Sequence, residues 1–251
     1  MLIRIIILVI ITNLSYASSD VMEPKQEKWN FDGAFGKFDR QSIQRGLKVY
    51  QEVCSACHSI KRLSFRNLMD IGFSDKEAKT IASSYNITDG PNDEGEMFER
   101  PARLSDYFPG PYLNDKAARA SNNGGLPPDL SLIIKARHDG ANYVFSLLTG
   151  FEAAPKSFTV GENMYYNPYF AGGGKQLLMA PPLIKDGQVL YDDDTKSTID
   201  QMSKDVVNFL QWVAEPEMED RKGMGIKVII FVLVMTVFFI AAKNRIWRRV
   251  K

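Results

Sequence analysis

The segment VCSACHS, residues 53–59, constrains the fold of this chain more than any other. It contains both cysteines of the 251 residues, Cys54 and Cys57, and one of the two histidines, His58. Cys-x-x-Cys-His is the attachment sequence for a c-type haem, in which both thiols form thioethers with the porphyrin. The adjacent imidazole then binds the iron as an axial ligand. The segment therefore predicts one covalent haem c, with His58 as an axial iron ligand.

Other sites that use the same residue types are weaker alternatives. Two cysteines in an exported protein also suit a disulfide or a redox thiol pair. A zinc site needs a further pair of Cys or His residues, and His138 is the only one left in the chain. Zinc therefore lacks ligands, whereas the disulfide remains a minor alternative to haem.

A six-coordinate haem iron needs a second axial ligand opposite His58. Met179 lies in QLLMAPPLI, where the following Pro181 and Pro182 stiffen the chain and suit a rigid loop that presents sulfur. A methionine beside leucines is as often an ordinary core residue. From spacing alone, the candidates remain Met179, His138 and the other methionines, among them Met69 near the attachment site.

The C-terminal region predicts a single membrane helix. Residues 223–242 contain one charge, Lys227, and 20 residues at about 1.5 Å each span one hydrocarbon core. A basic tail, residues 243–251, follows at once and places this end in the cytoplasm. A buried core helix is the alternative, and the length of the apolar run disfavours it.

The N-terminal region predicts export. Arg4 precedes a short apolar run, and Ser15-Tyr16-Ala17 provides the small-x-small cleavage pattern, so residues 1–17 are expected to be a signal peptide of bacterial type. Residues 18–222 would then form a periplasmic domain anchored in the bacterial inner membrane. They carry 24 basic and 30 acidic side chains, a net charge of −6. This charge disfavours nucleic acid and suits a basic protein partner.

The exported domain is expected to be mainly α-helical with long loops. Asp39 can cap a helix that runs to about residue 53, and Gly46 on it would allow a second helix to approach closely. Ser74 and Glu77 form a capping box for a short helix. Further helices are expected at about 115–122, 138–150 and 197–215. Residues 86–113 and 151–182 are predicted to be irregular.

Four blocks in this order resemble the cytochrome c1 family, the haem-bearing subunits of quinol:cytochrome c oxidoreductase (respiratory complex III). They are VCSACHS, NNGGLPPDLSLIIKARHDGANYVFSLLTGF, YYNPYFAGGGKQLLMAPPL and DVVNFLQWVAEPEMEDRKGMGIK, and the likeness runs from about residue 30 to 250. The resemblance implies a class I cytochrome c-like haem domain with insertions and one C-terminal transmembrane helix. It implies an electron-transfer subunit that is no enzyme on its own.

By this resemblance the haem is held through Cys54 and Cys57, with His58 and Met179 as the axial iron ligands. The implied haem pocket contains Asn122, Leu126, Pro128, Arg137 and Tyr143. Arg137 would pair with a haem propionate. Gly125 stands where the family pattern leads us to expect alanine, and AGGGKQLLM is richer in glycine than expected.

The resemblance also implies the partners. The chain would take an electron from a Rieske iron–sulfur protein and pass it to a soluble or tethered cytochrome c, beside cytochrome b in a dimeric membrane complex. Acidic loop residues would steer a basic carrier: Asp93, Glu94, Glu96, Asp192, Asp193 and Asp194. Three other functions remain open: a tethered cytochrome that shuttles electrons independently, a haem enzyme such as a peroxidase, and a purely structural haem protein of an assembly.

Overall fold

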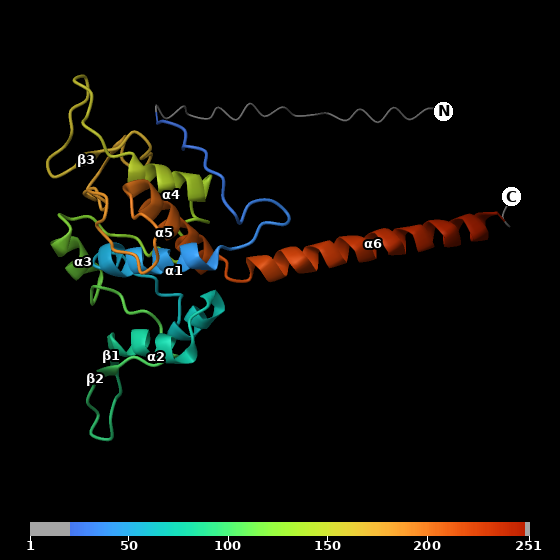
Figure 1. Cartoon of the computed structure of the whole chain (residues 1–251), viewed down its shortest axis with the longest axis horizontal. Helices are drawn as coiled ribbons and strands as arrows, with labels where there is room; N and C mark the ends of the chain where they lie inside the picture. The colour runs from blue at the N-terminus through green and yellow to red at the C-terminus, as the bar shows by residue number, and fades with distance from the viewer. Residues whose placement is uncertain (1–20, 249–251) are drawn as a thin grey trace.

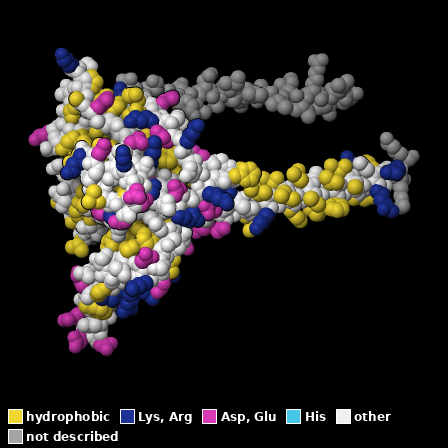
Figure 2. Space-filling view, viewed as in Figure 1, with side chains coloured by type: hydrophobic (Ala, Val, Ile, Leu, Met, Phe, Trp, Pro, Cys, Tyr) yellow, Lys and Arg dark blue, Asp and Glu magenta, His cyan; other side chains and the backbone are white. Residues whose placement is uncertain are grey.

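A computed structural model describes residues 21–248. The predicted signal peptide, residues 1–17, lies outside the described residues. Figure 1 shows a helical domain from which one long helix, α6, extends away. In Figure 2 apolar side chains cover most of this helix. Mainly α-helical structure with one C-terminal helix fit to span a membrane is therefore confirmed.

The helices follow the chain in an order close to the predicted one. The elements are α1 (Arg40–Val49), the π-helical turn η1 (Tyr50–Cys54), the 3-10 helix η2 (Phe65–Ile71), α2 (Asp75–Ser83), strands β1 (Asn86–Asp89) and β2 (Phe98–Pro101), α3 (Asp115–Ser121), α4 (Gly140–Thr149), strands β3 (Tyr165–Tyr166) and β4 (Gln176–Leu177), α5 (Ile199–Ala214) and α6 (Met218–Trp247). Among the described residues the strands form only two short antiparallel pairs.

The domain is organised around the crossing of α1 and α5. Gly46 of α1 lies against the backbone of α5, and a Cβ placed there would come within 2.0 Å of the Asp205 carbonyl oxygen. Side chains of both helices fill the surrounding core, namely Ile43, Leu47, Val206, Phe209 and Leu210. The predicted close approach at Gly46 is thus confirmed.

One buried charge lies within this crossing. The Asp205 side chain is fully buried, and it accepts hydrogen bonds from Ser42 Oγ at 2.6 Å and from Arg45 Nε at 2.9 Å. A buried carboxylate is tolerated when such partners satisfy it. The pair therefore ties α1 to α5 without an uncompensated charge.

Two predicted helix starts agree with the structure. Asp39 caps α1 and accepts hydrogen bonds from the main-chain N–H groups of Gln41 and Ser42. Ser74 and Glu77 form the expected capping box at the start of α2. Each cap satisfies donors that the first helical turn leaves free.

Residues 86–113 differ from the irregular loop that the sequence predicts. β1 and β2 form a hairpin in which Asn86 pairs with Pro101 and Asp89 with Phe98. The Arg100 side chain binds Asp89 within the hairpin and Asp106 beyond it, the latter at 2.7 Å. This ion-pair network orders a segment whose polar composition carries no strand pattern.

The connection between the last two helices is short. The residues EPEMEDRKGM, 215–224, predict a joint of about ten residues, but only residues 215–217 separate α5 from α6. The predicted membrane stretch, residues 223–242, forms the middle of a 30-residue helix. The first turn of α6 therefore belongs to the domain rather than to a linker.

Candidate haem site

The two cysteines lie where helical structure ends. α1 continues into the wider turn η1, which ends at Cys54, and π-helical turns are frequent at functional sites. The main-chain N–H of His58 donates to the Cys54 carbonyl at 2.9 Å, and the Tyr50 hydroxyl donates to the His58 carbonyl at 2.9 Å. The turn thereby holds Cys54, Cys57 and His58 in one compact unit.

The sulfur atoms of the two cysteines are not bonded to each other. Neither cysteine takes part in a disulfide, and burial raises the pKa of the Cys54 thiol to about 12, with nearby Cys57 adding to the rise. A redox-active thiol pair needs a lowered pKa instead. The disulfide and redox alternatives thus find no support in this geometry.

The His58 imidazole is oriented by a residue 70 positions away. Its Nδ1 lies 2.8 Å from the carbonyl oxygen of Pro128. Because a carbonyl only accepts, Nδ1 carries the proton and Nε2 keeps its lone pair. Burial lowers the pKa of His58, against the opposing effect of the Pro128 carbonyl and of Asp129. A neutral imidazole held by its other nitrogen is the form that binds a metal.

Asp129 links the loop that carries Pro128 to the chain that follows His58. Its Oδ2 accepts from Ser59 Oγ at 2.7 Å and from the Lys61 N–H at 2.9 Å. Burial would raise the pKa of Asp129, yet hydrogen bonds from Lys61, Ser131 and Ser59 hold it below its ordinary value. Sequence reasoning missed this residue, although an Asp two positions before a serine is typical of a local turn.

Met179 lies in the irregular segment after β4. It is half-buried, and its neighbour Leu178 contacts Gly125, where a Cβ would come within 3.0 Å of Leu178 Cδ1. The loop that carries Leu126 and Pro128 therefore meets the loop that carries Met179. This contact explains glycine at 125, because an alanine there would push Leu178 aside.

The glycine-rich segment before Met179 forms a closed loop. The Asn167 N–H donates to the Lys175 carbonyl at 2.8 Å, and the Lys175 N–H donates to the Phe170 carbonyl at 2.9 Å. Gly172 and Gly173 lie against the Phe170 ring, where a Cβ would come within 3.1 Å. The glycines therefore let the chain fold tightly over this ring before it reaches Met179.

The remaining predicted pocket residues occupy the loop after α3 and the start of α4. Asn122 Nδ2 donates to the Tyr112 hydroxyl at 2.9 Å and to the Ala118 carbonyl at 2.7 Å. Leu126 is 39% exposed. Burial raises the pKa of Tyr143, and Arg137 beside it opposes the rise. His138, the other ligand candidate, is exposed.

The donor set as a whole fits a covalent haem. It comprises two thiols, an oriented imidazole, a half-buried thioether, an apolar side chain left partly exposed and a guanidinium at the surface. Across residues 21–248, no cluster of three or more His, Cys, Asp or Glu side chains could hold a metal ion. The zinc alternative therefore fails in the described part of the chain.

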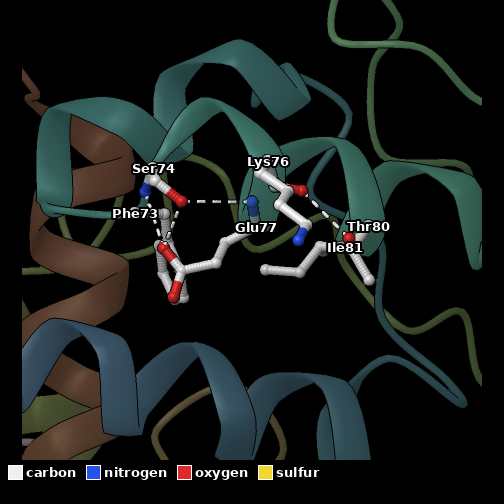
Figure 3. A pocket seen from close by; sticks show the side chains of 6 residues that line it. All are labelled: Phe73, Ser74, Lys76, Glu77, Thr80 and Ile81. Carbon is white, nitrogen blue, oxygen red and sulfur yellow. Dashed lines mark hydrogen bonds between the residues drawn. The ribbon is translucent and has the colours of Figure 1, made fainter.

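A surface hollow beside α2 has a different character. Figure 3 shows its lining, in which the Glu77 carboxylate accepts from the Ser74 N–H at 2.8 Å and from the Ser74 hydroxyl at 2.6 Å. These are the bonds of a helix cap. None of the predicted haem-site residues lines it, so the hollow is no part of the site.

Comparisons with known proteins agree with this geometry. Residues 29–250 match the family model described as Cytochrome C1 family. An Arabidopsis thaliana protein named cytochrome c1 1, heme protein, mitochondrial, is 50% identical over 83% of this chain and 67% of the relative. Cytochrome c1 of Rhodospirillum rubrum is 42% identical, over 90% of this chain and 88% of the relative. The Candida albicans protein named cytochrome b-c1 complex catalytic subunit, mitochondrial, is 44% identical, over 94% of this chain and 81% of the relative.

Proposed function

This chain belongs to the cytochrome c1 family, and from that premise we propose that it accepts an electron from a Rieske iron–sulfur protein and passes it to cytochrome c. It is a redox subunit that carries one covalently bound haem c. When bound, the haem supplies a one-electron redox centre. The subunit would work within a b–c1 complex beside cytochrome b, in a dimeric assembly.

The hydrogen bond between His58 and Pro128 carries this proposal. With the Nδ1 proton held by the Pro128 carbonyl, Nε2 is free for the iron, and Cys54 and Cys57 supply the two thioether sulfurs in the same turn. A main-chain carbonyl as partner keeps the ring orientation independent of pH. These three residues would fix the haem and set its position.

Met179 would supply the second iron ligand. A thioether together with an imidazole would raise the haem potential and leave no vacant position for oxygen or peroxide. The peroxidase alternative requires such a vacancy. Carbon monoxide, which binds reduced haem at a vacant position, therefore distinguishes the two functions, and we expect none to bind the native protein.

The pocket residues would act on the haem edge. Leu126 and Pro128 would pack against the ring, and Asn122 would brace the loop that holds them through Tyr112 and Ala118. Arg137 is exposed and would pair with a propionate. These contacts would exclude water from the bound haem and would leave the one-electron centre able to exchange electrons with a partner.

The proposed topology follows from α6. Residues 18–222 would form the periplasmic haem domain, residues 223–242 the transmembrane part of α6, and residues 243–251 a basic cytoplasmic tail. Lys243, Arg245 and Arg248 at the far end of the helix favour this orientation. The chain is thus a membrane-anchored protein whose haem would face the periplasm.

The joint with α6 favours a fixed subunit over an independent shuttle. Glu219 accepts from Arg40 Nη2 at 2.8 Å and from the Phe38 N–H at 2.7 Å, and Met218 is buried. A shuttle needs a mobile tether. Here the domain is held directly against its anchor.

A difference spectrum tests the proposal. The protein is extracted from its own membranes in mild detergent and purified, and the absorption of the oxidised sample is subtracted from that of the reduced sample. We expect bands of b-type haem together with the c-type band. A c-type band alone, reproduced across gentle detergents, would instead favour the independent shuttle.

A further inference from the structure

An exposed phenylalanine, Phe35, lies between aromatic residues that are buried. Trp29, Phe31 and Phe38 belong to the core, and the rings of Trp29 and Phe31 stack with centroids 5.5 Å apart. Between them Phe35 is 82% exposed. Residues 32–36 are called the Phe35 loop below. Neither the haem site nor the core uses this side chain.

The backbone of the loop holds Phe35 outward. Gly33 has φ +69°, and a Cβ on Gly36 would come within 2.1 Å of the Asp32 carbonyl oxygen. The loop is closed at its base, where the Lys37 N–H donates to the Asn30 carbonyl at 2.8 Å. Such a tight turn is a defined structure that leaves no route for Phe35 into the core.

The loop is bound to the start of the anchor helix. Lys222 Nζ of α6 donates to the carbonyl of Phe31 at 2.5 Å and to that of Gly36 at 3.3 Å. Lys222 directly precedes the apolar stretch that begins at residue 223. Figure 1 shows the chain between the N-terminal segment and α1 bulging alongside the first turns of α6.

We propose that Phe35 inserts into the lipid interface beside α6 and gives the domain a second contact with the bilayer. This rests on α6 acting as the membrane anchor. A loop fastened at Lys222 lies at the level where the apolar stretch enters the membrane, so its contact with lipid continues that of α6. An uncharged ring suits the boundary between headgroups and acyl chains. Two exposed charged residues, Asp32 and Lys37, flank Phe35 in the sequence.

A second contact would restrict the tilt of the domain. α6 alone fixes one axis, about which the haem domain can lean or turn. A lipid-inserted Phe35 together with the Lys222 bonds defines a plane against the membrane. The haem would then keep a constant height above the bilayer.

Electron paramagnetic resonance on the assembled complex in lipid bilayers tests this inference. A nitroxide is attached to a Phe35→Cys variant, since the two native cysteines are occupied by haem. Accessibility to oxygen, which concentrates in lipid, is compared with accessibility to a water-soluble nickel chelate. We expect the oxygen-to-nickel ratio at position 35 to exceed severalfold that of a Leu113→Cys control, a residue 97% exposed just before α3.

A third label separates this inference from the anchor on which it rests. Val237→Cys lies on α6 and should report lipid. If position 237 reports lipid while position 35 matches the aqueous control, the Phe35 contact is refuted and the anchor stands. If position 35 is shielded from both reagents, a protein partner covers it, and the lipid contact is equally refuted. An aqueous signal at position 237 would refute the anchor itself.

Discussion

Asp129 links the turn that contains His58 to the loop whose Pro128 carbonyl orients the imidazole. Replacing it with alanine removes the acceptor for Ser59 Oγ, the Lys61 N–H and the Ser131 N–H. Hydrogen bonds to a charged group contribute about 1.5–3 kcal/mol each, but Asp129 is only half-buried and water replaces part of what they supply, so we expect a total loss of about 3 kcal/mol. The midpoint of thermal unfolding should fall by about 6–12 °C.

Unfolding of the Asp129→Ala variant is followed by haem absorption. Asp70→Ala is the matched control, because its carboxylate is exposed and accepts only a long bond from Asn67 Nδ2, at 3.4 Å. We expect the control to unfold near the native midpoint. Equal midpoints for the two variants would mean that Asp129 does not stabilise the site.

Met179→Ala tests the distal ligand. Without the thioether, the midpoint potential should fall and the reduced haem should bind carbon monoxide. Met164→Ala, at another half-buried methionine, which directly precedes β3, should change neither property. An unaltered potential in Met179→Ala would refute the assignment and make His138 the next residue to test.

At the scale of the elements, the α1–α5 crossing depends on Gly46. An alanine Cβ would meet the Asp205 carbonyl at 2.0 Å and Phe209 Cβ at 2.7 Å, so the helices must separate. Overpacking of this kind destabilises by about 1–3 kcal/mol or more. We expect Gly46→Ala to yield little folded haem protein, whereas Gly225→Ala on α6, with open space around it, should be neutral. Normal yield from both would contradict the tight crossing.

The joint between α6 and the domain should weaken in acid. Hydrogen bonds from Arg40 hold the pKa of Glu219 below its ordinary 4.5, with the Phe38 N–H and Lys37 adding to the effect and burial opposing it. A lowered carboxyl pKa stabilises the joint above pH 4.5, and this stability is lost as the pH falls through the folded value. The protection of the Phe38 amide against hydrogen exchange, measured relative to the intrinsic exchange rate at each pH, should therefore fall there.

A Glu219→Gln variant isolates this titration. Glu215, paired with Arg221 and Lys135, also has a lowered pKa, although burial opposes that shift. If Glu219 is responsible, the Phe38 amide of the variant should show low protection at every pH and no further loss of protection in acid. A loss of protection in acid that persists in the variant would assign the effect to Glu215.

At the scale of the whole molecule, the acidic residues predicted to steer a carrier lie in two places. Asp192 binds Lys48 at 2.9 Å and Asp193 binds Arg45 at 2.8 Å, so their charges are largely compensated, and Asp194 beside them is exposed. Three others are exposed between β1 and β2, namely Asp93, Glu94 and Glu96. Figure 2 shows acidic side chains at the tip of this hairpin, away from α6.

Neutralising the hairpin tests whether it steers a basic carrier. The triple variant Asp93→Asn, Glu94→Gln and Glu96→Gln should slow reduction of cytochrome c on the order of tenfold at low ionic strength and flatten the salt dependence. Glu23, Glu152 and Glu162 changed to Gln remove the same charge from other exposed positions. Equal rates in the two variants would show that net charge alone matters.

The sequence predicts the helices better than the segments between them. Asp39 and the Ser74–Glu77 box mark true helix starts, because a cap acts on its own first turn. The hairpin escapes prediction because Arg100 orders it through Asp106, outside the strands. The short joint before α6 escapes prediction for a similar reason, because Glu219 binds Arg40, a residue far from it in the sequence.

The sequence by itself determined the haem attachment motif and the anchor, because ligand spacing and the length of an apolar run are properties read along the chain. Only the tertiary structure decided which carbonyl orients His58, which loop meets Leu178 and that the exposed Phe35 lies in a loop bonded to Lys222. Main-chain carbonyls are alike at every residue, so no residue type marks Pro128 as the acceptor for His58. The close contact between Gly125 and Leu178 likewise depends on where a segment distant in the sequence passes.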